Sequence, residues 1–106
     1  MTRFALAAAV AASAFALAAP VSATGRMTCD AGPQSGWRSQ DQLVRHLTRQ
    51  GWQVRRTKID GGCYEVYATM RNGDRVEAYF HPATFRRLLV SRRGQVIYRA
   101  PAERRR

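Results

Sequence analysis

The chain has 106 residues, of which 18 are basic and seven acidic, so its formal net charge is +11. This length fits one small domain with a thin core. The charge predicts attraction to polyanions such as phosphate-bearing lipid headgroups or acidic polysaccharide. Only Lys58 is a lysine, so the composition of an arginine-rich proteome explains the charge as well as a selected polyanion site does.

Residues 1–23 have the pattern of a secretory signal peptide. Arg3 precedes an alanine-rich apolar run, and Val21, Ser22 and Ala23 form a small-residue cleavage site. The apolar run is shorter than the roughly 20 residues that a membrane-spanning helix needs. We therefore expect cleavage after Ala23, a periplasmic or secreted bacterial protein, no transmembrane segment in the mature chain and no nucleic acid as its partner in the cell.

Cys29 and Cys63 are the two cysteines of the chain. An exported domain with a thin core usually needs a covalent cross-link, so the two predict a disulfide. In the chain-entropy account, closing a loop of this length stabilises the fold by about 3 to 4 kcal/mol. The cysteines and histidines lack the short paired spacing of structural zinc sites, so we expect neither a metal nor a cofactor.

The first regular element is predicted after an extended segment, residues 24–37, which is rich in Gly, Pro, Ser and Thr. A helix is expected over residues 39–50, because Ser39 and Gln42 fit a capping box and Gly51 is a typical C-terminal stop. Its apolar stripe consists of Leu43, Val44 and Leu47.

Residues 52–59 indicate a strand. Trp52 and Val54 share one face of it, whereas Ile59 falls on the other face. Either the strand contains a bulge near Arg56 or its second half is solvated. A turn at residues 60–62 follows.

Two strands then flank Asn72 and Gly73, and the turn length sets their register. A two-residue turn would mix apolar and charged side chains on each face. A three-residue loop over residues 71–73 pairs Ala68 with Val76 and keeps one face apolar. We predict this loop, with Gly73 in the left-handed conformation and the helix covering the apolar face.

The opposite face of this hairpin carries polar and aromatic side chains. The predicted register places Tyr67 opposite Glu77 and Glu65 opposite Tyr79. We expect this face to be exposed to water, where its carboxylates would not acquire a raised pKa. Aromatic and Arg side chains on a rigid sheet are good interface anchors, so the candidate partner-binding face is Glu65, Tyr67, Arg75, Glu77, Tyr79 and His81.

A second hairpin is predicted from "FRRLLV" (85–90) and "QVIYR" (95–99), after Pro82 ends the preceding strand. Residues 101–106 are expected to form a disordered basic tail. The fold class is then α+β, with one N-terminal helix on a small antiparallel meander of three to five strands, and residues 38–100 form the domain.

Several runs of the sequence resemble the PepSY domain family, in particular its small exported single-domain members. They are "GW" (51–52), "GCYEVYA" (62–68), "NGDRVEAYF" (72–80) and "HPAT" (81–84), and the likeness covers residues 37 to about 85. The resemblance implies a small α+β module that binds or inhibits peptidases or regulates the cell-envelope environment. His81 and Phe85 depart from the family's common Asp-Pro-x-Thr-Gly, which puts the tight turn and any role of the acid in doubt.

The sequence contains no nucleophile motif and no phosphate loop, so we expect a protein that is not an enzyme. The prediction is an exported PepSY-like binding module for a protein partner in the envelope, with peptidase inhibition or regulation as its role. The alternative is a cationic envelope-associated protein that binds anionic lipid or polysaccharide through its arginines. Steep salt dependence would distinguish this alternative.

Overall fold

The computed structural model describes residues 25–102. The expected signal peptide of residues 1–23 and the tail beyond residue 102 lie outside the described part. The described elements are η1 (Gln34–Gly36), α1 (Gln40–Arg49), β1 (Gln53–Asp60), β2 (Cys63–Thr69), β3 (Arg75–Phe80), β4 (Arg87–Arg92) and β5 (Gln95–Arg99). Among them, no helix is long and apolar enough to cross a membrane.

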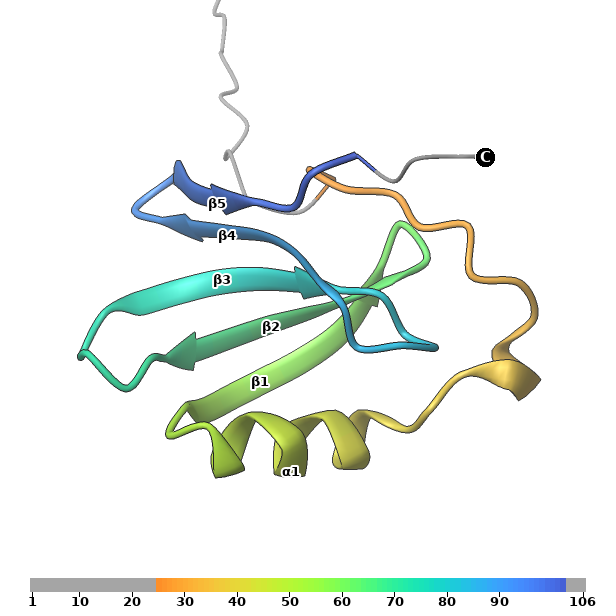
Figure 1. The fold of residues 1–106 in the computed structure, drawn as a ribbon, viewed down its shortest axis with the longest axis horizontal. Helices are drawn as coiled ribbons and strands as arrows, with labels where there is room; N and C mark the ends of the chain where they lie inside the picture. The colour runs from red at the N-terminus through yellow and green to blue at the C-terminus, as the bar shows by residue number, and fades with distance from the viewer. Residues whose placement is uncertain (1–24, 103–106) are drawn as a thin grey trace, which may run out of the picture.

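The five strands form one antiparallel meander, in which each strand pairs with the next along the chain (Figure 1). The α+β class is therefore confirmed, with the second hairpin included in the same sheet. The helix is the first element of the predicted domain and follows the expected extended segment, which contains the short 3-10 helix η1 that was not predicted.

Helix α1 begins with the predicted capping box. The Ser39 hydroxyl accepts a hydrogen bond from the Gln42 backbone N–H at 3.0 Å, and the Gln42 side chain accepts one from the Ser39 N–H at 2.8 Å. These two bonds satisfy backbone donors that the first turn of a helix leaves free. Leu43 and Leu47 are fully buried, and Gly51 ends the helix with a φ of 90°.

The main core lies between α1 and one face of the sheet. Each large apolar side chain buried there contributes about 1.5 to 3 kcal/mol relative to an exposed one. Its buried members are Leu43, Leu47, Trp52, Tyr64, Val66, Ala68, Val76, Ala78, Phe80, Phe85 and Val90.

The β2–β3 hairpin has the predicted register. Ala68 pairs with Val76, and Tyr64 pairs with Phe80. The backbone N–H of Met70 donates to the Asp74 carbonyl at 2.8 Å, which closes a three-residue loop. Gly73 in that loop has a φ of 95°, where a side chain is unfavourable.

Strand β1 contains the bulge that was one of the two predicted alternatives. The register shifts between Val54 and Arg56, and after the shift Ile59 pairs with Tyr64. Paired residues point to the same face, so the bulge returns Ile59 to the helix side of the sheet. Ile59 is nevertheless 44% exposed, at the end of an edge strand.

Candidate functional site

The sheet face opposite α1 is covered over part of its area by the N-terminal segment, defined here as residues 25–30. Cys29 is bonded to Cys63, with their Cα atoms 5.1 Å apart. The Cys29 N–H donates to the Gly61 carbonyl at 2.8 Å, and the Gly25 N–H donates to the Asp60 carboxylate at 2.6 Å. The predicted disulfide is thus present, and it fixes this segment against the sheet.

This cover contradicts the expectation that the whole face is exposed to water. Glu65 and Tyr79 are 0% exposed. Tyr79 belongs to a second apolar cluster with Leu88 and Leu89, against which Met27 packs. Its hydroxyl donates to the Asp60 carboxylate at 2.9 Å. Tyr79 is therefore part of the structure's interior and cannot anchor a partner.

Glu65 occupies an unfavourable position for a carboxylate. Neither of its oxygens has a hydrogen-bond partner among the described residues, and the Lys58 ammonium lies 3.8 Å from Oε1. Burial raises the pKa of Glu65, an effect that the nearby Tyr67 hydroxyl and Lys58 oppose. The expectation of an unperturbed carboxylate here is wrong.

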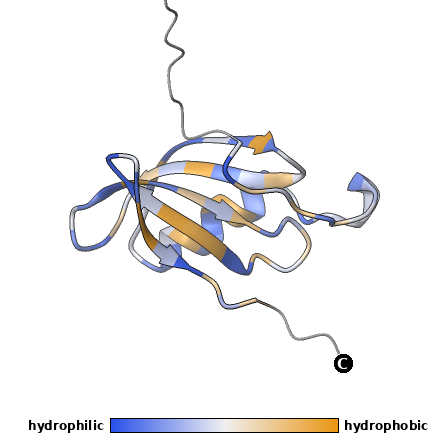
Figure 2. Ribbon diagram, turned by 90° about the horizontal axis from the view of Figure 1, so that it is seen from above, coloured by the Kyte–Doolittle hydropathy of each residue, from blue (hydrophilic) through white to orange (hydrophobic). Residues whose placement is uncertain are grey.

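The remaining part of this face forms a groove of about 750 Å³. It lies at the end of the sheet where the β2–β3 loop and the β4–β5 turn meet. Both turns are hydrophilic and lie at the same end of the sheet in Figure 2. Eleven residues line it, and three of them belong to the predicted face: Tyr67, Arg75 and Glu77. The others, which were not predicted, include Arg55, Ser91 and Arg93.

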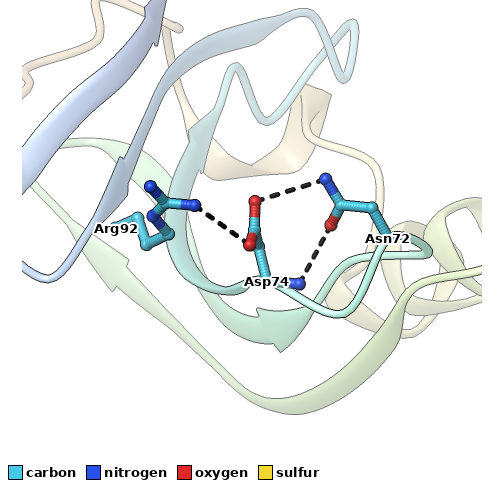
Figure 3. A network of polar contacts seen from close by, with 3 residues as sticks. All are labelled: Asn72, Asp74 and Arg92. Carbon is cyan, nitrogen blue, oxygen red and sulfur yellow. Dashed lines mark hydrogen bonds and ion pairs between the residues drawn. The ribbon is translucent and has the colours of Figure 1, made fainter.

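One rim of the groove is held by a polar network (Figure 3). Arg92 donates to Asp74 Oδ1 at 3.1 Å, which links β4 to the β2–β3 loop. Asn72 donates to Asp74 Oδ2 at 3.2 Å and accepts from the Asp74 N–H at 2.9 Å. These contacts neutralise Arg92 and give the loop a defined position beside the groove.

The other groove arginines are available to a ligand. Arg55, Arg75 and Arg93 are exposed, and within residues 25–102 none of them forms an ion pair or a hydrogen bond through its side chain. Ser91 is 1% exposed, and its hydroxyl has no partner in the described chain. Neither histidine lines the groove, so the serine has no neighbouring imidazole base. The arrangement fits binding better than nucleophilic chemistry.

The register could have indicated part of this groove in advance. Ser91 is the cross-strand neighbour of Glu77. Pairing the strand that contains "FRRLLV" with "VEAYF" in an antiparallel register would have placed Ser91, the next residue, on the polar face. The bulge between Tyr79 and Phe80 shifts the alternation, however, and a regular period-2 pattern does not reveal it.

Comparison with known protein families matches residues 3–88 to the peptidase propeptide and YPEB domain, known as PepSY. The match covers most of the 106 residues. The chain belongs to the PepSY family. No curated protein and no solved structure gives a significant match to it.

This PepSY chain keeps a tight turn despite the two departures from the family pattern. Phe85 takes the left-handed conformation expected of glycine, with a φ of 66°, and its N–H donates to the His81 carbonyl at 2.7 Å. His81 Nδ1 accepts from the Ala83 N–H at 3.1 Å, as an aspartate oxygen would. His81 therefore has a local structural role, and it lies beyond the end of β3 that is remote from the groove.

Proposed function

We propose that this PepSY chain is an exported, non-catalytic binding module that inhibits or regulates a peptidase of the bacterial cell envelope. The family match over residues 3–88 is the observation that carries the proposal. The leader pattern of residues 1–23 and the disulfide support export, because disulfides persist in oxidising compartments.

The open groove is the surface that best suits a protein partner. It combines the Tyr67 ring with the guanidinium groups of Arg55, Arg75 and Arg93, which have no partner within residues 25–102. Tyrosine and arginine are enriched among residues that dominate binding energy at protein interfaces. Of the partner-binding face predicted from the sequence, the proposal therefore keeps only the residues that line the groove: Tyr67, Arg75 and Glu77.

The proposal is tested with the purified chain beginning at Thr24, added to an envelope extract of the source bacterium that degrades fluorescent casein. We expect a saturable fall in the rate of casein degradation, and no degradation by the chain alone. Arg75→Glu in the groove should weaken the inhibition. Arg45→Glu, at an exposed position of α1, is the matched control and should leave it intact. An unchanged rate at every concentration would count against the proposal.

The net charge of +11 favours one second candidate, a cationic protein that binds anionic envelope lipid or polysaccharide. Vesicles of phosphatidylglycerol, with phosphatidylcholine as control, test it directly. Tight binding to the anionic vesicles that falls steeply with ionic strength, without any effect on casein degradation, would favour this candidate over the peptidase role.

A further inference from the structure

The groove contains a buried polar group that no part of the described chain satisfies. Ser91 is 1% exposed and lines the groove, and its hydroxyl has no hydrogen-bond partner within residues 25–102. A buried hydroxyl without a partner is costly, and most such groups in native proteins have one. Its position in the wall of the groove allows a ligand to provide that partner.

The β4–β5 turn presents an arginine in a conformation that arginine rarely adopts. Arg93 has a φ of 52° and Gly94 a φ of 80°. Two positive φ values are typical of the tight hairpin turn that favours Asn-Gly. A residue held in such a conformation at a binding surface is consistent with a functional role for its side chain, which here borders the groove.

Arg75, at the start of β3, provides a second cation in the lining of the groove. Like Arg93, it is exposed and makes no described ion pair. The planar guanidinium group matches a carboxylate through two parallel hydrogen bonds. Two unpaired arginines and a hydroxyl around one groove therefore form a set of donors for a carboxylate.

The acidic residues of the groove restrict the kind of anion. Asp74 and Glu77 also line it, and Asp74 is already paired with Arg92. A long polyanion crossing the groove would be repelled by the Glu77 side chain. A peptide is better suited, because its backbone N–H groups can donate hydrogen bonds to the Glu77 carboxylate. Its own carboxylates are separated along the chain and can lie next to the arginines instead. The Tyr67 ring adds apolar surface suited to a peptide's side chains.

We propose that this groove binds a carboxylate-bearing peptide segment, with Arg75, Arg93 and the Ser91 hydroxyl as the groups that hold the carboxylate. The assignment rests on the proposed function, because it specifies which chemical group of the protein partner is bound. An acidic loop or a chain terminus of that partner would supply the ligand.

The experiment measures direct binding to the purified chain by fluorescence anisotropy. The probe is a rhodamine-labelled octapeptide of glycine and serine with two central glutamates, and its glutamine counterpart is the uncharged control. We expect the glutamate peptide to bind more tightly. Arg75→Gln should weaken its binding about twofold to fivefold, a range typical of one exposed charge pair, whereas Arg45→Gln on α1 should not.

Two further variants separate ligand binding from a structural role. Ser91→Ala removes the unsatisfied hydroxyl, and Arg93→Asn places a favoured residue in the turn. Both should keep or raise the melting temperature while they weaken binding of the glutamate peptide. Equal affinity for the glutamine peptide, or unchanged affinity in both variants, would overturn the assignment. So would tighter binding of inorganic polyphosphate, because it would identify a polyanion as the ligand.

The outcome is separable from that of the casein assay. Binding of the glutamate peptide without inhibition of casein degradation would contradict the peptidase role and still support the groove assignment. Inhibition that persists in Ser91→Ala and Arg93→Asn, with no preference for the glutamate peptide, would support the peptidase role and contradict this assignment.

Discussion

Glu65 shows how a single buried group can set the pH dependence of stability. Burial raises the pKa of Glu65 in the folded state above 4.5, the ordinary value for a glutamate. Its contribution to stability is therefore full below about pH 4.5 and is lost as the pH rises through the raised pKa of the folded state. The Lys58 ammonium, 3.8 Å from Glu65 Oε1, opposes this rise in the pKa of Glu65.

We predict that Glu65→Gln raises the melting temperature at neutral pH, because glutamine cannot acquire the buried charge. Thermal melts of both proteins between pH 3 and 8 would check this. The difference in melting temperature should be small at pH 3, where the carboxyl is protonated, and should grow above about pH 4.5. A difference that stays constant over the whole range would contradict the prediction.

Tyr67 and Tyr79 look equivalent in the alternation of the hairpin but differ in the structure. Tyr79 is fully buried and bonded to Asp60, whereas Tyr67 is half-buried beside the groove. Burial and the charge of Glu65 raise the pKa of Tyr67 to about 12, so its hydroxyl stays protonated at neutral pH and can donate a hydrogen bond.

We predict that Tyr79→Ser lowers the free energy of unfolding by about 3 kcal/mol or more, as is typical when a buried aromatic ring is removed. Tyr67→Ser should cost about 1 kcal/mol, because its ring already contacts solvent. Urea unfolding followed by tryptophan fluorescence measures both values. Similar losses for the two variants would show that the cover over Tyr79 is weaker than its burial indicates.

At the scale of elements, the turns explain which glycines the fold requires. The β1–β2 turn, Gly61 and Gly62, has positive φ values of 63° and 80°. A Cβ on Gly62 would lie 2.5 Å from the Cys29 carbonyl oxygen, whereas a Cβ on Gly73 would have no atom within 4 Å. The first turn therefore needs glycine for conformation and for space, and the second only for conformation.

Gly62→Ala and Gly73→Ala form a matched pair for this reason. We predict that Gly73→Ala costs about 1 kcal/mol, the usual penalty for a side chain in the left-handed region. Gly62→Ala should cost clearly more, about 2 kcal/mol or above, because the N-terminal segment must also move. Chemical unfolding measures the loss in free energy of unfolding for both variants. Equal losses would mean that moving the N-terminal segment has no measurable energetic cost.

At the scale of the whole molecule, the disulfide joins the N-terminal segment to a sheet that one helix covers from the other side. The two apolar clusters lie on opposite faces of the sheet, and the second one depends on Met27 and Cys29. A domain of this size has a small net stability, so a single cross-link is a large share of it.

We predict that replacing Cys29 and Cys63 together by alanine lowers the free energy of unfolding by about 3 to 4 kcal/mol. The loss of the cross-link should also release the N-terminal segment, so trypsin should cleave after Arg26 faster than in the parent protein. Urea unfolding and timed digests followed by mass spectrometry test the two effects. Unaltered cleavage at Arg26 would show that backbone hydrogen bonds alone hold the segment.

Local patterns in the sequence determined the elements and their pairing. The capping box at Ser39, the stop at Gly51 and the alternation around Asn72 and Gly73 each act within a few residues. The single apolar face then selected the register, because a shift of one residue would have exposed the whole set of core side chains. The disulfide was predicted from the two cysteines together with the leader pattern of residues 1–23.

Only the tertiary structure decided what covers the second face of the sheet. The N-terminal segment is remote in sequence from Glu65 and Tyr79. The alternation of residues in β2 and β3 does not predict that this segment packs on them. The groove likewise depends on two bulges and on the meeting of two turns, which set where Arg55 and Ser91 lie. Burial of a polar residue is a property of the neighbours that surround it in space, so the identity of the residue alone did not reveal it.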